Sequence, residues 1–252
     1  MNKIILPLLC LLLMPFAPVF ALECELSDCM RYRPASSRYR VEFDQAYLYA
    51  KVRRIDETLF QTSATLSAYV RNDLNFSISV PYEFVTLSAG SRTVREDGLT
   101  DVFVDSRWTF YEQKGKFNLV LRTGVILPTG DYKKGFGSGR VRGNLFLTAT
   151  KELSPVSVFL NLGYRLNSNR VGEENHLWLA SLGGRFGIYK NLKGVVSLEV
   201  DRQASKNGSP DPISWLVYLV YPINGRFDLN GGVRGFINST EYIGYFGTGF
   251  NF

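Results

Sequence analysis

The last eleven residues read "YIGYFGTGFNF" and alternate in a pattern that decides the fold. One set of alternate positions carries mostly large apolar side chains, with small or polar residues between them; that set includes Tyr242, Phe246, Phe250 and Phe252. Successive side chains of a β-strand point to opposite faces, so this period of two predicts a strand that persists to the final residue. Chain ends usually fray, which makes a strand ending on Phe252 informative.

The same period of two recurs upstream. "LNFSISV" (74–80), "FNLVLRTGVIL" (117–127) and "VSVFLNLGYRL" (156–166) each set apolar residues on one face against polar or small residues on the other. Such alternation indicates half-buried strands. It predicts twelve of them, at about 40–54, 58–71, 73–85, 100–112, 116–128, 143–151, 156–166, 176–188, 194–204, 213–222, 226–237 and 242–252.

The connections between these segments alternate in length. Short turns are expected at 71–73, 112–116, 152–155, 189–194 and 222–226, and longer loops at 86–99, 129–143, 167–175 and 203–212. This arrangement is typical of an all-β fold, the closed antiparallel transmembrane β-barrel of outer membranes. About twelve strands place both termini on the periplasmic side and let the first strand pair with the last, leaving no edge in lipid. A secreted β-sandwich is the alternative, but no second apolar set faces the recurring one.

Composition agrees with strands and turns. The 252 residues contain 14% aromatic residues and 23 Gly, with one His. The formal charge of +6 comes from scattered residues without a run of five like charges, so no nucleic acid is expected as a partner. Beyond the N-terminus, no apolar stretch is long enough for a spanning helix.

The N-terminus predicts export. Residues 1–21, "MNKIILPLLCLLLMPFAPVFA", combine one cation at Lys3 with an uncharged stretch and a small residue at Ala21, as in a secretory signal peptide. The alternative, a membrane anchor, is disfavoured by three prolines. Residues 22–38 are then a periplasmic N-terminal segment, and 39–252 the barrel. Cys24 and Cys29 are expected to form a local disulfide in an oxidising compartment.

The middle of the chain resembles a known family. The residues concerned are "VPYEFV", "GLTDVFVDSRWTFY", "LRTGVILPTGDYKKGFGSGR" and "LNLGYRLN", of which "LPTGD" (127–131) is the most specific. They resemble the Gram-negative outer-membrane barrels known as phenol-degradation meta-pathway proteins or outer-membrane transporters. The resemblance implies a channel-type barrel with poorly defined solutes and no catalytic residues. The terminal Tyr242, Phe246, Phe250 and Phe252 strand also resembles the signal read by the outer-membrane assembly machinery.

Candidate chemistry is weak elsewhere. The glycines of "GFGSGR" (135–140) lack the "GK[ST]" of a phosphate-binding loop and indicate an exposed, flexible loop. His176 has no Ser in register for a lipid-acting barrel enzyme and is interpreted as a loop-edge residue near the outer surface. No catalytic residue, metal site or cofactor is therefore expected.

The inward faces carry the candidate site. Charged and polar residues of both signs are predicted to line a pore: Arg40, Glu42, Asp44, Asp101, Asp105, Arg107, Arg122, Asn161, Arg165, Glu199, Asp201, Asp228 and Arg234. Such charges are tolerated at membrane depth in a polar lumen. They either create a transverse field that orients solutes or neutralise one another in a plug. Segment 213–222 differs, because Leu216, Tyr218 and Val220 make its inner face apolar; either a loop packs on them or the lumen accepts an aromatic solute.

The sequence thus predicts an outer-membrane, porin-like channel through which small polar or aromatic solutes diffuse, with membrane lipid and the assembly machinery as further partners. A closed structural or adhesive barrel remains the alternative, because twelve strands enclose a lumen intermediate between filled and open barrels.

Overall fold

A computed structural model describes residues 37–52, 55–167, 174–201, 212–237 and 241–252. These residues form thirteen β-strands, and none of their segments is a helix long and apolar enough to cross a membrane. The strands are β1 (Tyr39–Val52), β2 (Ile55–Arg71), β3 (Leu74–Ala89), β4 (Arg92–Leu99), β5 (Val102–Gln113), β6 (Phe117–Leu127), β7 (Arg142–Glu152), β8 (Val156–Leu166), β9 (His176–Tyr189), β10 (Leu192–Asp201), β11 (Ile213–Pro222), β12 (Phe227–Phe236) and β13 (Tyr242–Asn251).

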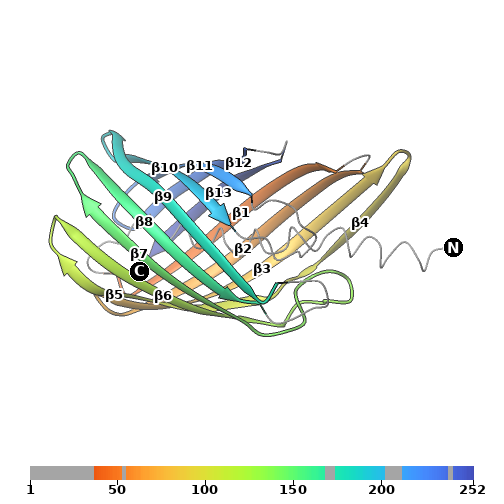
Figure 1. Cartoon of the computed structure of the whole chain (residues 1–252), viewed down its shortest axis with the longest axis horizontal. Helices are drawn as coiled ribbons and strands as arrows, with labels where there is room; N and C mark the ends of the chain where they lie inside the picture. The colour runs from red at the N-terminus through yellow and green to blue at the C-terminus, as the bar shows by residue number, and fades with distance from the viewer. Residues whose placement is uncertain (1–36, 53–54, 168–173, 202–211, 238–240) are drawn as a thin grey trace.

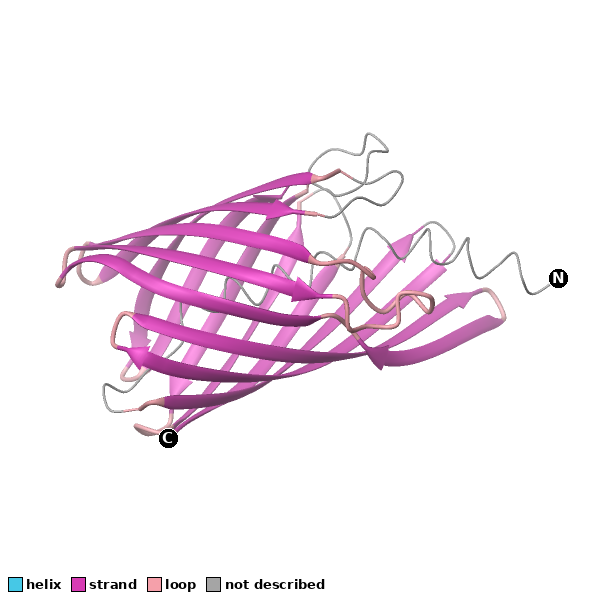
Figure 2. Cartoon of the chain, turned by 90° about the horizontal axis from the view of Figure 1, so that it is seen from below, coloured by secondary structure: helices cyan, strands magenta, loops and turns pink. Residues whose placement is uncertain are grey.

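The strands close into one antiparallel barrel (Figures 1 and 2). Neighbours in sequence pair in turn, except that β5 pairs with β3 and not with β4. The ring is completed by β13 and β1, from Arg40 opposite Asn251 to Tyr49 opposite Tyr242. Beyond them, the Phe252 N–H donates to the Tyr39 carbonyl and the Tyr39 N–H to the Phe252 carbonyl, both at 3.0 Å. The aromatic end of the chain is therefore part of the closing ladder. The predicted closed barrel is confirmed.

Segment 86–99, predicted to be a long loop, is instead the tip of β3 and the whole of β4. β3 pairs with β5 through Leu74–Ser79 and with β4 through Tyr82–Ala89. β4 and β5 thus follow one another along the same edge of β3, and the ring keeps twelve positions. The alternation of β3 continues past Val85 to a turn at Gly90, whose φ of 62° suits glycine. Figure 1 shows this hairpin projecting beyond the other strands.

The two ends of the barrel differ. At the end here named the short-turn end, brief connections join β2 to β3, β5 to β6, β7 to β8, β9 to β10 and β11 to β12, and Arg38 donates its N–H to the C-terminal Phe252. The opposite end, named the loop end, carries the β3–β4 hairpin and the connection 128–141 (Figure 2).

The two faces of the sheet have opposite character. The outer face is apolar and exposed; Phe43 and Trp178 are each 58% accessible. The inner face is polar and buried, as in the run of Ser63, Thr65 and Ser67 on β2. A soluble protein would rarely expose so large an apolar band, whereas a membrane barrel presents such a band to lipid.

Candidate pore interior

The structure places twelve of the thirteen predicted inward residues on the inner face of their strands and the remaining one, Asp101, in the break between β4 and β5. Ten of the thirteen form the ion pairs or hydrogen bonds described below, among themselves or with neighbouring residues. The other predicted features lie elsewhere: the signal peptide, Cys24 and Cys29 fall outside the described residues.

The first group lies at the closing seam, the junction where β13 pairs with β1. Arg40 on β1 donates to Asp228 on β12 through Nη1 and Nη2, at 2.6 and 2.9 Å, and its Nη2 lies 3.0 Å from Glu42. To reach β12 the arginine crosses β13 at Gly249, where a Cβ would collide with its guanidinium. Arg40 and Asp228 are each 1% exposed. Bidentate geometry of this kind is the strongest form of ion pair, and glycine makes it possible here.

A second glycine of β13, Gly247, has the same role at this seam, two residues before Gly249. Asp44 of β1 and Asn230 of β12 both lie opposite Gly247 of β13, and a Cβ there would collide with both side chains. Asn230 accepts a 2.6 Å hydrogen bond from the hydroxyl of Tyr218. The polar side chains of β1 and β12 thus meet above two glycines of β13, Gly247 and Gly249, here named the glycine track.

Two further ion pairs link strands of the barrel wall away from the seam. Arg234 of β12 donates to Glu199 of β10 at 2.6 Å across β11, with both side chains buried. Arg122 of β6 donates to Asp105 of β5, which also accepts from the hydroxyl of Ser77. Neighbouring strands carry further polar contacts on the same face: Arg165 donates to Asn144, Asn161 to Ser181, and Thr65 to Ser79, each at 2.9 Å.

Asp101 organises the connection 128–141, here named the inner loop. Its carboxylate accepts from the backbone N–H of Gly130 at 3.2 Å, from the N–H and hydroxyl of Ser138 at 2.7 and 2.8 Å, and from Arg142 at 3.3 Å. Gly137, with φ of 95°, lets the backbone approach Asp101 where a Cβ would collide. The prediction that these glycines are exposed is wrong, because they are half-buried and allow the loop to fold against a buried carboxylate.

The tip of the inner loop, Phe136, is 2% exposed and packs inside the barrel. Its ring lies against Gly98 of β4 and joins an apolar cluster on the inner face, formed by Ala46, Leu48, Leu59, Val85, Leu87 and Ile243. Sequence reasoning missed this cluster, because it ended the third strand at Val85 and took the residues after it for a loop. The period-two spacing of Val85 and Leu87 was the available signal.

Among the described residues, the apolar inner face of β11 is covered by a strand residue. Leu216, Tyr218 and Val220 form a small cluster against which Tyr245 of β13 packs. The inner loop packs on β1, β2, β3 and β13 instead. Of the two predictions for β11, the aromatic solute stays a prediction.

His176 begins β9 on the outer face. Its Nδ1 lies 2.5 Å from the hydroxyl of Tyr164, and Trp178 packs on Tyr164 at 4.7 Å between ring centroids. Such aromatic groups are typical of the membrane interface. Among the described residues, no group of three His, Cys, Asp or Glu side chains could hold a metal ion.

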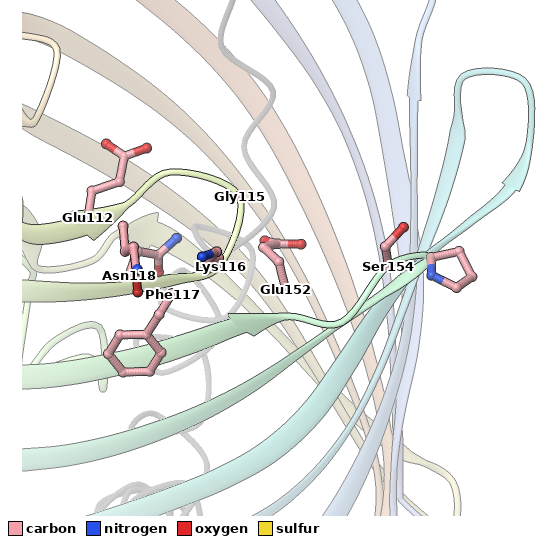
Figure 3. A pocket seen from close by; sticks show the side chains of 9 residues that line it. Glu112, Gly115, Lys116, Phe117, Asn118, Glu152 and Ser154 are labelled. Atoms are coloured by element: carbon pink, nitrogen blue, oxygen red, sulfur yellow. The ribbon is translucent and has the colours of Figure 1, made fainter.

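A separate cavity of about 410 Å³ lies at the short-turn end (Figure 3). The β5–β6 and β7–β8 turns form it, with Glu112, Lys116 and Glu152 among its lining. The Glu152 N–H donates to the Lys116 carbonyl at 2.9 Å, which ties the two turns together.

At the β2–β3 turn of the same end, exposed Arg71 donates to Asp73 and this hydrogen bond lowers the pKa of the Asp73 carboxyl.

A closed antiparallel barrel of twelve ring positions, apolar outside and polar inside, belongs to the class of transmembrane β-barrels. A family model described as "Putative MetA-pathway of phenol degradation" matches residues 39–252, so the chain belongs to that family. The resemblance inferred from the sequence motifs is thereby confirmed.

Solved structures share the fold at low sequence identity. An outer-membrane channel from Pseudomonas putida F1 matches with a TM-score of 0.66 and 12% identity, over 88% of this chain and 100% of that one. The KdgM porin matches at 0.56 and 13%, over 83% and 99%. The translocator domain of the autotransporter NalP from Neisseria meningitidis matches at 0.57 and 12%, over 94% and 96%. No curated protein matches the sequence.

Proposed function

We propose that this protein is an outer-membrane channel through which small polar or aromatic solutes diffuse passively, without catalysis. The observation that carries the proposal is the buried, charged inner face inside an apolar closed wall. Charges such as Arg40, Glu199 and Arg234 are costly at membrane depth unless they line or fill a polar lumen. Membership of the family and the fold shared with a channel and a porin support the same function.

The remaining parts of the proposal follow from the sequence. The predicted signal peptide would export the chain, the Cys24–Cys29 disulfide would form in the periplasm, and the terminal aromatic strand would serve the assembly machinery. The short-turn end would face the periplasm, because periplasmic turns of such barrels are short.

A closed-lumen structural barrel is the second candidate, favoured by one specific observation. Arg40, Asp228, Glu199 and Arg234 pair within the wall and are at most 3% exposed, and the inner loop folds inward at Phe136. Side chains that neutralise one another in this way could fill the lumen instead of lining a path.

The two candidates differ in ion selectivity. In planar bilayers under a salt gradient, the channel should show a reversal potential that shifts toward anions when Asp44 and Asp105 are changed to Asn. It should shift toward cations when Arg122 and Arg165 are changed to Gln, because fixed charges in a narrow channel act at short range with little screening. Leu119→Val on the outer face is the control and should change nothing. Absent conduction, or selectivity indifferent to all four substitutions, would favour the closed barrel.

A further inference from the structure

The charges of the inner face are segregated between two sides of the barrel. Strands β5 to β9, together with Asp101 just before β5, carry five arginines and two aspartates among their buried or half-buried inward side chains. They are Arg107, Arg122, Arg142, Arg165, Arg185, Asp101 and Asp105. The buried and half-buried charges of this side, here named the basic wall, sum to +3; the exposed Glu112 and Glu152 at the short-turn end are outside this sum.

The other side has the opposite sign. On strands β10 to β13 and β1 to β3, seven carboxylates stand against two arginines: Glu42, Asp44, Glu57, Glu83, Glu199, Asp201, Asp228, Arg40 and Arg234. The same sum for this acidic wall is −5, without the exposed Arg71 and Lys193 at the short-turn end. Even without Glu57 and Glu83, which lie at the loop end beside the apolar cluster, its charge stays negative.

The two walls face one another across the lumen. In the ring of twelve positions, β7 lies six positions from β13, and β8 lies six positions from β1. Figure 1 shows the two groups as opposite sides of the barrel. Four buried ion pairs lie within one wall each and leave the separation in place: Arg40–Asp228 and Arg234–Glu199 in the acidic wall, and Arg122–Asp105 and Arg142–Asp101 in the basic wall.

Building on the channel function proposed above, we propose that this lumen favours small zwitterions, solutes that carry a separated ammonium and carboxylate. A simple ion is attracted by one wall and repelled by the other. A zwitterion can direct its carboxylate toward the basic wall and its ammonium toward the acidic wall at once. Opposed charges at short range in a poorly screened channel orient such a solute and raise its local concentration.

The test compares two isomers of formula C₃H₇NO₂, zwitterionic β-alanine and neutral lactamide, in swelling assays with proteoliposomes. The readout is the ratio of their entry rates, which cancels differences in the number of channels. One variant lowers the charge of the basic wall, Arg107→Gln with Arg165→Gln, and a second that of the acidic wall, Asp44→Asn with Asp201→Asn. Neither changes a member of the four ion pairs. Lys134→Gln with Asp73→Asn, exposed at the two ends, is the matched control.

Each wall variant should lower the β-alanine to lactamide ratio by about threefold or more, in line with the effect of focused charge on local solute concentration, and the control should leave it unchanged. Folding of every variant is checked by its gel shift on boiling. If one wall variant does not fold, the other alone still tests the inference. If both isomers enter and the ratio is the same in wild type and wall variants, the channel function stands and the zwitterion inference is overturned. If neither isomer enters wild-type vesicles, the channel function itself fails.

Discussion

Between β13 and β1 the hydrogen-bond ladder runs from Tyr242 to Asn251 without interruption, whereas on β3 it changes partner between Ser79 and Tyr82. At the seam, the backbone closes the wall and the buried Arg40–Asp228 pair reinforces it from inside. At the break between β4 and β5, β4 has only β3 beside it among the described strands. The inner loop covers this region through its contacts with Asp101 and through Phe136. Seam residues should therefore control folding of the whole barrel, and break residues should control only the lumen near the loop end.

The largest effect should come from removing the end of the seam. Deleting residues 250–252 should leave export intact but prevent assembly, because the last strand can then no longer complete its pairing with β1. Membrane fractionation and the gel shift on boiling measure this outcome. A truncated chain that assembles normally would show that the terminal strand does not decide closure.

Breaking the buried pair at the seam should have the next largest effect. Asp228→Ala removes the bidentate carboxylate partner of the buried Arg40 and should lower the free energy of unfolding by about 3 kcal/mol, a typical cost of removing one partner of a buried ion pair. Urea unfolding in lipid vesicles measures the change. Asp73→Ala removes a half-exposed carboxylate that accepts from Arg71 and Trp108 at the β2–β3 turn, and should change the free energy of unfolding much less than Asp228→Ala does. Equal effects of the two substitutions would remove the distinction between seam and surface.

The glycine track can be tested within one strand. Gly249→Ala should lower the free energy of unfolding by about 1–3 kcal/mol, since its Cβ would displace the Arg40 guanidinium and overpacked sites carry costs of this size. Gly244→Ala, also on β13, adds a Cβ with nothing within 4 Å and should be neutral. The comparison requires only the unfolding curves of the two variants, and it fails if Gly249→Ala is as stable as Gly244→Ala.

At the break, substitutions should affect stability least and conduction most. Phe136→Ala and Asp101→Asn each remove one attachment of the inner loop and should increase the single-channel current, because the loop then no longer occupies the lumen beside β4. Lys134→Ala, an exposed charge of the same loop, should leave the current unchanged. Currents identical to wild type in both attachment variants would mean that the loop does not obstruct the path.

The sequence predicted the features that depend on one strand at a time. Alternation identified the strands and their inward faces, and it placed Phe252 in the closing ladder, because a period of two needs no tertiary information. The cross-strand contacts could not be predicted in this way. Arg40 reaches Asp228, 188 positions away, only because Gly249 lies between them in the folded ring.

The inner loop shows the same limit. Taken locally, its glycines predict flexibility. Only the position of Asp101, between β4 and β5, makes them places where the loop backbone approaches a buried carboxylate. The β3–β4 hairpin was missed for a related reason: its residues from Arg92 to Leu99 are mostly charged or polar and exposed on both faces, so the alternation that marks a half-buried strand is weak there.

The most direct test of whether the charged inner face is a path for solutes is the current through the purified wild-type protein in a planar lipid bilayer at fixed voltage. A channel lined by Asp44, Arg122 and Arg165 predicts discrete, repeatable current steps as single barrels insert. A protein that inserts as a folded, heat-modifiable barrel and yet leaves the bilayer without current steps would contradict it, and would identify the inner charges as the filling of a closed barrel.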